Sequence, residues 1–238
     1  MSLAWQPAWQ AVVHHPLFGV GLTLAAYQLA SSLYERSRLM FLQPVLVSMA
    51  LVIAVLVPLG VGYDEYRQST TLLNLLLGPA TVALAVPLFL NLKRIRLLFW
   101  PTLLTLALGG LVATAMGVGL AWVFGAEHMV LMTMAPKSVT SPIAMLVAEQ
   151  IGGVAALAAV FVLITGVAGA MLGPEMLRRV GVHHPAAQGM ALGITAHAVG
   201  TARALQEGEE CGAFAALAMS LMGVATAVLL PLAVAMIV

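Results

Sequence analysis

The chain has 238 residues, of which 62% are hydrophobic and only 8% are charged, and its mean hydropathy is +1.04. Soluble globular proteins carry roughly 25% charged residues, so this composition excludes a water-soluble fold. A net charge of +1 without a basic stripe excludes a nucleic-acid partner, and the single cysteine, Cys211, excludes an internal disulfide.

Long uncharged runs lie between short clusters of charged residues. Spanning a bilayer core takes about 20 predominantly apolar residues in a helix. The runs that reach or approach this length cover 16–34, 39–63, 68–92, 97–126, 150–174, 180–202 and 211–238. The pattern predicts an all-α fold, a polytopic transmembrane helical bundle with about seven spanning helices. The first 15 residues contain no Lys or Arg, so we expect no cleavable signal peptide.

The basic residues predict the orientation of these helices. Most of them lie in the loops 35–38, 93–96 and 178–179, which the positive-inside rule places in the cytoplasm. The loops 64–67, 127–128 and 207–210 carry almost none, and we expect them outside. The segment 128–149 must then enter and leave the membrane on the outer side, which predicts a re-entrant hairpin. If that segment crosses fully instead, the charge rule fails for the helices that follow it.

The predicted topology divides a single domain, 1–238, into two halves of similar spacing and opposite orientation. The halves, 42–124 and 150–238, have the arrangement of an inverted repeat, which is common in secondary transporters. The middle helix of each half carries a predicted break, at Gly78-Pro79 in the first and at Gly200 in the second. Broken helices in matching positions indicate a transport site, although each break taken alone is also compatible with a simple kink.

The hairpin contains a lysine between two prolines, Pro136 and Pro142, which exclude a continuous helix. A capped half-helix is predicted from Pro142 to about Gln150, and its first N–H groups carry a positive partial charge. Together with Lys137 these groups suit a carboxylate or another small anion. The alternative is a surface hairpin with a solvated lysine. The candidate binding residues in the hairpin are Lys137, Ser138, Thr140, Ser141 and Pro142.

Further candidates lie on both sides of the second predicted break. Arg203, close to Thr201, has a guanidinium group that binds carboxylates through two parallel hydrogen bonds. Its alternative role is to reach the membrane interface near Glu207. His197 is a candidate proton carrier, because imidazole titrates near pH 6.5, or else a side chain that only forms hydrogen bonds within the bundle.

The remaining candidates are less specific. Glu149 is predicted either to pair with Lys137 or to take up a proton, or else to be a solvated carboxylate at the outer edge. Asn74 and Thr81 lie near the first break, and both are candidates for substrate contact or for helix–helix hydrogen bonds. No nucleophile–base or phosphate-binding motif occurs, and His183-His184 offers too few metal ligands, so we expect no enzymatic activity, cofactor or metal.

Three sequence motifs resemble the LrgB/CidB family, and the likeness runs from about Pro16 to the C-terminus. The motifs are Pro136–Ala144 followed by Glu149–Gly153, Leu77–Leu88, and His197–Ala204. One departure is Ala196, where the family commonly has a serine before the histidine. This departure argues against a hydroxyl role at that position.

The resemblance implies two functions. Plant members are described as plastid glycolate/glycerate translocators, and some bacterial members are linked to pyruvate uptake. Other bacterial members are described as antiholin- or holin-like proteins that modulate murein hydrolase export and autolysis, commonly with a small LrgA/CidA-type membrane partner. We therefore expect a multi-pass protein of the bacterial inner membrane that carries small monocarboxylates with an ion gradient, or alternatively an autolysis modulator. A homodimer is expected only by analogy with other carriers.

Overall fold

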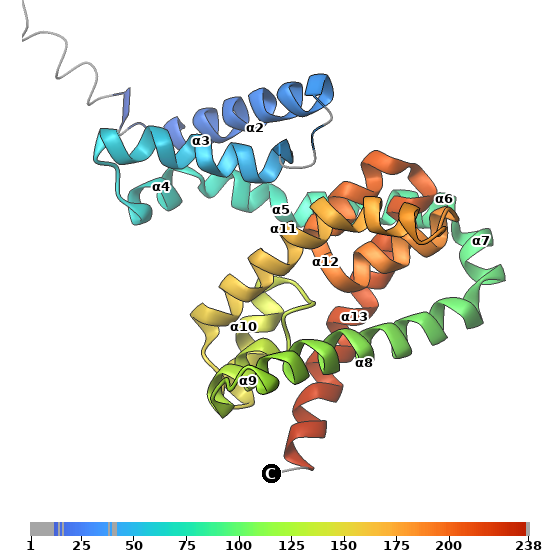
Figure 1. The fold of residues 1–238 in the computed structure, drawn as a ribbon. Helices are drawn as coiled ribbons and strands as arrows, with labels where there is room; N and C mark the ends of the chain where they lie inside the picture. Colours follow the sequence, from blue (N-terminus) through green and yellow to red (C-terminus); the bar gives the residue numbers. More distant parts are fainter. Residues whose placement is uncertain (1–11, 14, 16, 38, 40–41, 237–238) are drawn as a thin grey trace, which may run out of the picture. The chain divides into compact units, whose positions relative to one another are not determined.

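The computed structural model describes residues 12–13, 15, 17–37, 39 and 42–236, and every element longer than two residues in this part is a helix (Figure 1). The predicted all-α membrane bundle is therefore confirmed. By length and composition, four stretches of the described chain are able to cross a membrane, or five if the bent pair α3–α4 forms one span, where about seven were predicted. The four are Thr71–Leu90, Phe99–Val123, Ala155–Arg179 and Glu209–Ala235.

Two compact units make up the chain, residues 1–83 and residues 84–238. The predicted first repeat, 42–124, is divided between these units, whereas the predicted second repeat, 150–238, lies entirely within the second unit. The inverted repeat itself stays a prediction.

The first unit consists of α2 (Phe18–Ser37), α3 (Pro44–Leu59), α4 (Tyr63–Ser69) and α5 (Thr71–Ala83). The side-chain oxygen of Gln43 begins α3 by accepting hydrogen bonds from the backbone N–H groups of Val45 and Leu46, at 3.1 and 3.3 Å. Gly60 ends this helix in the left-handed conformation, φ 69°, which glycine adopts without strain. After this turn the chain bends by 118° between α3 and α4.

Pro79 does not break its helix. The predicted break at Gly78-Pro79 is wrong, because α5 continues through Pro79 to Ala83. The turn comes at Leu84, between α5 and α6 (Ala85–Leu90). Pro87 explains this position, because proline has no N–H to donate to the carbonyl group of Ala83, four residues earlier.

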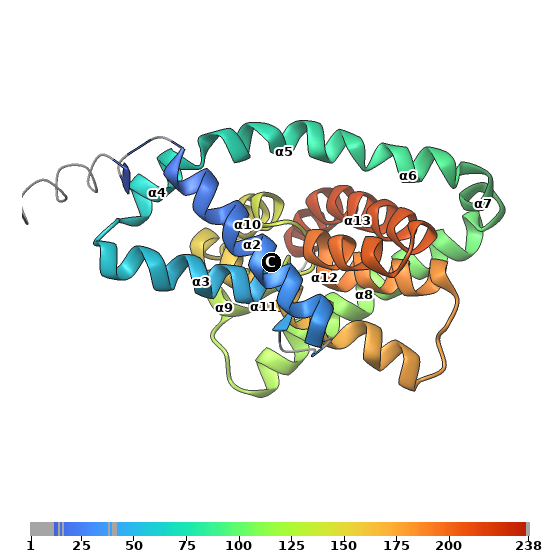
Figure 2. The ribbon, with the colours of Figure 1, turned by 90° about the horizontal axis from the view of Figure 1, so that it is seen from above.

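Three long helices frame the second unit: α8 (Phe99–Val123), α11 (Ala155–Arg179) and α13 (Glu209–Ala235). The short helices α9 (His128–Met134) and α10 (Ser141–Gln150) connect α8 to α11, and α12 (Pro185–Glu207) connects α11 to α13. Figure 2 shows α12 beside α13, the most extensive helix contact in the chain. Buried apolar side chains from α8, α10, α11, α12 and α13, and from the segment before α10, meet in one core, which includes Val139, Val162, Ile194 and Phe214.

Ion pairs reveal which helix ends lie together in the second unit. The side chains of Arg94, before α8, and Glu210, at the start of α13, approach to 2.7 Å. The side chains of Arg178, at the end of α11, and Glu207, at the end of α12, approach to 3.9 Å. The segments 91–96, 175–179 and 207–210 therefore share one end of the unit, which we call the basic end. The prediction that 207–210 lies on the side opposite to 93–96 and 178–179 is wrong.

The same ion pairs correct the course of α12. A straight helix of 23 residues would carry Glu207 far from the end of α11, yet the two meet. The chain reverses at His197, whose backbone angles, φ 41° and ψ −125°, are not helical. The first arm of α12 therefore leads away from the basic end to His197, and the second arm returns to the basic end. The run 180–202, predicted to form a spanning helix, is instead part of a helical hairpin.

Candidate functional site

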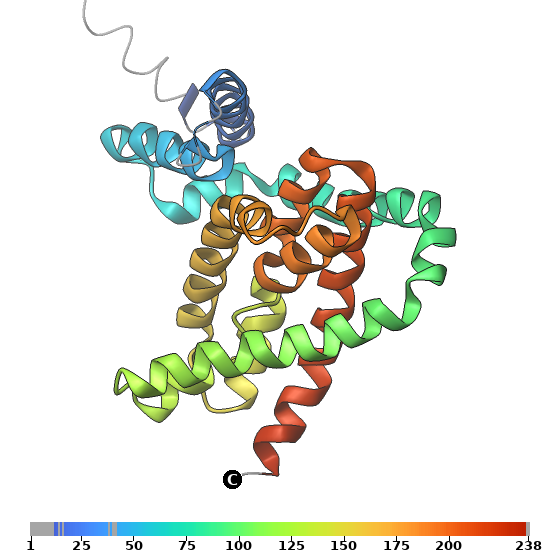
Figure 3. The ribbon, with the colours of Figure 1, turned by 45° about the vertical axis from the view of Figure 1, so that its right-hand side comes forward.

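The site residues predicted between 128 and 149 lie on a second helical hairpin. The backbone N–H of Val154, just beyond α10, donates to the hydroxyl group of Thr133 in α9 at 2.9 Å, so the two arms run side by side. The tip of this hairpin is the segment 135–140. Because α9 follows the C-terminal end of α8 and α10 leads to the N-terminal end of α11, the hairpin starts from the end opposite the basic end (Figure 3). Whether 128–149 is re-entrant in a bilayer stays a prediction.

The start of α10 matches the sequence prediction closely. The helix begins at Ser141, with Thr140 as the N-cap residue in an extended conformation and Pro142 in the first turn. Proline is favoured there because its missing N–H belongs to the groups that have no partner within the helix. The predicted side-chain cap is absent, since the hydroxyl group of Thr140 accepts no hydrogen bond from the first N–H groups of α10. The first N–H groups of α10 are thus left without a side-chain acceptor at the N-cap.

Lys137 reaches the middle of α8. Its ammonium group donates hydrogen bonds to the carbonyl group of Ala113 and to the hydroxyl group of Ser138, both at 3.3 Å. Its aliphatic stem packs over Gly117, where any Cβ atom would overlap the Lys137 Cε atom. Among the described residues no carboxylate lies within ion-pair distance of Lys137. The ammonium group, which has three donors, therefore has only two neutral acceptors, both at long distance.

His197 lies at the tip of the α12 hairpin and is the one described non-glycine residue with a positive φ. Its side chain is 3% exposed, and its Nε2 atom lies 3.0 Å from the carbonyl oxygen of Val162 in α11. A carbonyl group only accepts, so Nε2 carries the proton in the neutral ring. The other ring nitrogen, Nδ1, is buried and has no hydrogen-bond partner among the residues that the structure describes. It is a basic nitrogen whose lone pair is unused.

Small residues let the α12 hairpin close tightly. A Cβ atom at Gly200 would overlap the carbonyl oxygen of Leu192 on the opposite arm. The hydroxyl group of Thr201 donates to the carbonyl oxygen of His197 at 2.8 Å and so fixes the backbone after the reversal. The predicted break at Gly200 therefore occurs three residues earlier, at His197, and Gly200 instead allows close contact between the arms. Thr201 is 2% exposed, and its hydroxyl group also lies 3.7 Å from the sulfur atom of Met219 in α13.

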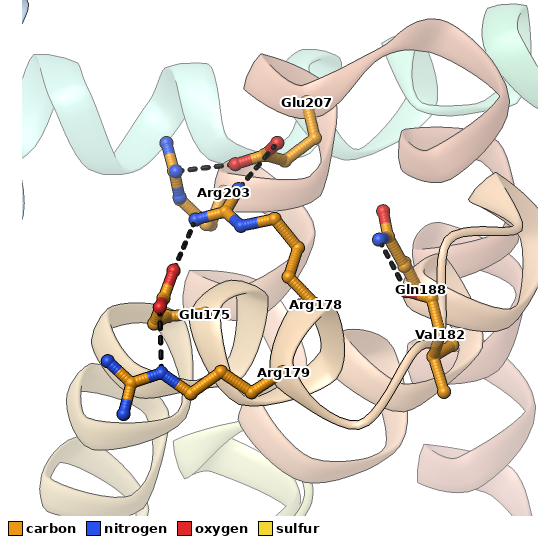
Figure 4. Close-up of polar contacts among 7 residues, drawn as sticks. All are labelled: Glu175, Arg178, Arg179, Val182, Gln188, Arg203 and Glu207. Atoms are coloured by element: carbon orange, nitrogen blue, oxygen red, sulfur yellow. Dashed lines mark hydrogen bonds and ion pairs between the residues drawn. The ribbon is translucent and has the colours of Figure 1, made fainter.

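Arg203 lies in a chain of alternating charges at the basic end, shown in Figure 4. Its guanidinium group donates to Glu207 and, at 3.0 Å, to Gln206. Glu207 also approaches Arg178 to 3.9 Å, and Glu175 accepts from Arg178 and Arg179 at 3.1 and 2.8 Å. Gln206 and Glu207, which accept hydrogen bonds from Arg203, thus belong to the basic end and not to the surroundings of Lys137. The arrangement matches the alternative role that the sequence left open for Arg203.

The other predicted site residues do not join Lys137. Glu149 is exposed at the far end of α10, and the hydrogen bonds of Lys137 go to other groups, so the predicted pair is absent. Asn74 belongs to the first unit, where it lines a shallow pocket with Asp64, Arg67, Gln68 and Thr71. The side chain of Thr81 lies outside the described residues. No three His, Cys, Asp or Glu side chains in the described chain lie close enough to hold a metal ion.

Sequence reasoning missed two parts of this site. Both lie on α8. The carbonyl group of Ala113 accepts a hydrogen bond from Lys137, and Gly117 leaves room for the aliphatic stem of Lys137. The one sequence signal for them is the high glycine content of α8, which contains Gly109, Gly110, Gly117 and Gly119. Glycines within a membrane helix often mark the close approach of another element.

Comparison with known proteins gives a consistent result. The profile of the LrgB-like family matches residues 23–236. The uncharacterized protein YxaC of Bacillus subtilis (strain 168) is 38% identical over 203 residues, which cover 85% of this chain and 88% of the relative. The antiholin-like protein LrgB of Bacillus mycoides (strain KBAB4) is 32% identical over 218 residues, which cover 91% of this chain and 95% of the relative. No solved structure matches.

Proposed function

Since the chain belongs to the LrgB-like family and is a multi-pass membrane protein, we propose that it is a secondary carrier of small monocarboxylates such as glycolate, glycerate, pyruvate or lactate. The observation that carries the proposal is the position of Lys137, which has no carboxylate partner among the described residues. Its ammonium group lies against the middle of α8, a long apolar helix. A lone charge at this depth costs about 2.5–3.5 kcal/mol on membrane-insertion scales, so such residues usually serve an ion or substrate pathway.

A carboxylate suits the groups around Lys137. In the proposed complex its oxygens replace the two long contacts of the ammonium group and also accept from the hydroxyl group of Ser138, which is 3% exposed. The uncapped start of α10 lies one turn away and adds N–H donors and a positive partial charge. A small organic anion fits this combination of an ammonium group, hydroxyl groups and free N–H donors better than a cation does. Ser138, Thr140 and Ser141 are the neighbouring groups that would orient the acid.

His197 is the proposed proton carrier. The Nδ1 atom accepts a proton without losing the hydrogen bond that Nε2 makes to Val162. The resulting imidazolium would offset the charge of an anion bound in the same unit. Glu149 is exposed and is the weaker candidate. The chain would then move a monocarboxylate together with a proton down a proton gradient.

The two hairpins suggest how access to the site would alternate. They start from opposite ends of the second unit, and their tips approach the middle of α8 and α11 respectively. Transporters commonly bind their substrate between broken helices of this kind. The basic end carries Lys93, Arg94, Arg96, Arg178 and Arg179, so we propose that it faces the cytoplasm and that the protein resides in the cytoplasmic membrane. In this scheme Arg203 stabilises the basic end and does not bind the substrate.

Uptake into proteoliposomes tests the proposal. Purified full-length protein should give saturable uptake of radiolabelled glycolate or pyruvate, faster when the lumen is alkaline. His197→Gln retains an amide N–H for the carbonyl group of Val162 but does not take up a proton. It should lose stimulation by the pH gradient while retaining exchange between labelled and unlabelled substrate. Absence of saturable uptake for all four monocarboxylates would refute the carrier proposal.

Autolysis control is the second candidate, because several relatives carry the name antiholin-like protein LrgB. In that case the chain would act on membrane integrity, together with a small LrgA/CidA-type partner, and would need no saturable substrate. Release of carboxyfluorescein from the same proteoliposomes separates the candidates. A carrier should take up substrate without dye release, whereas a holin-like assembly should release the dye, and the partner should change that release.

A further inference from the structure

The short helix α7 (Leu92–Leu97) forms a corner at the basic end, and its side chains divide into three groups. Ile95, together with Leu98 just after the helix, packs against the core of the second unit. Arg94 pairs with Glu210 at 2.7 Å, and Asn91, before the helix, donates to Glu209 at 3.3 Å. The remaining two cations, Lys93 and Arg96, are exposed and form no hydrogen bond or ion pair with any described residue.

Lys93 and Arg96 share a pocket with apolar side chains. They are three residues apart and therefore lie on the same face of the helix. The pocket has a volume of about 460 Å³ and is lined by Phe89, Leu90, Leu92, Lys93, Arg96 and Leu97. Phe89 and Leu97 are 75% and 79% exposed, so the apolar walls are open to the surroundings. The site combines two unpaired cations with an apolar surface.

Aromatic residues beside this pocket indicate its depth in the membrane. Phe99 and Trp100 follow α7 directly and stack edge to face, with ring centroids 5.5 Å apart. Trp100 is 68% exposed, and exposed tryptophan side chains of membrane proteins gather at the level of the lipid headgroups. The pocket therefore lies where phosphate groups and the upper parts of acyl chains are both within reach.

We propose that this pocket binds one anionic phospholipid. The guanidinium group of Arg96 and the ammonium group of Lys93 hold the phosphate, and an acyl chain lies along Phe89, Leu90 and Leu97. Of the two nearby carboxylates, Glu210 pairs with Arg94 and Glu209 accepts a hydrogen bond from Asn91, so neither neutralises Lys93 or Arg96. This charge pattern selects an anionic lipid over a zwitterionic one. The site is independent of the carrier proposal.

Native mass spectrometry of the full-length protein, titrated with phosphatidylglycerol or phosphatidylcholine in detergent, tests this inference. The wild-type protein should bind one phosphatidylglycerol in preference to phosphatidylcholine. Lys93→Gln with Arg96→Gln should weaken this binding about thirtyfold, because each of the two basic groups near a lipid surface contributes about a fivefold gain in affinity. Inorganic phosphate should not displace the lipid, since it lacks the acyl chain.

Two control variants complete the test. Arg36→Gln with Arg67→Gln removes the same number of charges from exposed positions in the first unit and should leave binding unchanged. Lys93→Arg with Arg96→Lys keeps both charges and should retain most of the affinity. The inference would be overturned by equal affinity for the two lipids, by unchanged binding in the Lys93/Arg96 double glutamine variant, or by displacement with phosphate alone.

Discussion

The guanidinium group of Arg178 lies 3.9 Å from the carboxylate of Glu207, which brings the end of α11 next to the end of α12. The 23 residues of α12 therefore leave the basic end and return to it. The reversal places His197 against the middle of α11, at the tip of a buried hairpin. It also makes α13 start at the basic end, where α8 starts as well.

Site-directed labelling tests this course of the chain. In a Cys211→Ala background, Val180→Cys after α11 and Glu209→Cys at the start of α13 should react with a membrane-impermeant maleimide from the same side of the membrane. Phe124→Cys, 86% exposed just after α8, should react from the opposite side. Reaction of positions 180 and 209 from opposite sides would mean that α12 spans the membrane.

Arg203 should matter for stability and not for substrate affinity. Its side chain is 13% exposed and pairs with Glu207, so Arg203→Gln should lower the free energy of unfolding by about 1 kcal/mol. Thermal unfolding of the purified protein measures this loss. The Kd for glycolate should stay within about twofold of the wild-type value. A large rise in Kd at unchanged stability would return Arg203 to the substrate site.

Two glycines of α8 provide a matched test of the position of Lys137. A Cβ atom at Gly117 would overlap the stem of Lys137, whereas a Cβ atom at Gly119 would have nothing within 4 Å. Gly117→Ala should therefore displace the ammonium group and raise the KM for uptake about tenfold, the equivalent of a typical overpacking penalty. Gly119→Ala should leave the KM unchanged. Equal KM values for the two variants would show that the stem of Lys137 does not lie over α8 in the working carrier.

The sequence was informative where proline or composition determines the local structure. Pro142 and the residues before it predicted the start of α10 to within a residue, and the apolar runs predicted an all-α membrane fold. The reversal of α12 has no such local signal, because no proline lies near His197 and the turn depends on packing against α11. Gly166 and Gly169 of α11 provide the room for His197 and Ala196, respectively. A contact of this kind is recognised only once both helices are placed.

The loop charges illustrate a second limit. The acidic residues Glu207, Glu209 and Glu210 predicted an outer loop because the segment 207–210 itself contains no Lys or Arg. In the structure, Glu207 meets Arg178 and Glu210 meets Arg94 at the basic end. A count of charges along the sequence does not detect cations such as Arg94 and Arg178, which other segments of the folded chain place beside the loop 207–210.

Equilibrium binding of radiolabelled glycolate and pyruvate to the purified protein, measured by scintillation proximity, tests the central claim most directly. The wild-type protein and the exposed-charge control Arg36→Gln should both show saturable binding with the same Kd. Lys137→Gln should bind at least about thirtyfold more weakly, because removal of one partner from a buried charge pair costs 2 kcal/mol or more. Binding by Lys137→Gln with the wild-type Kd would contradict the account.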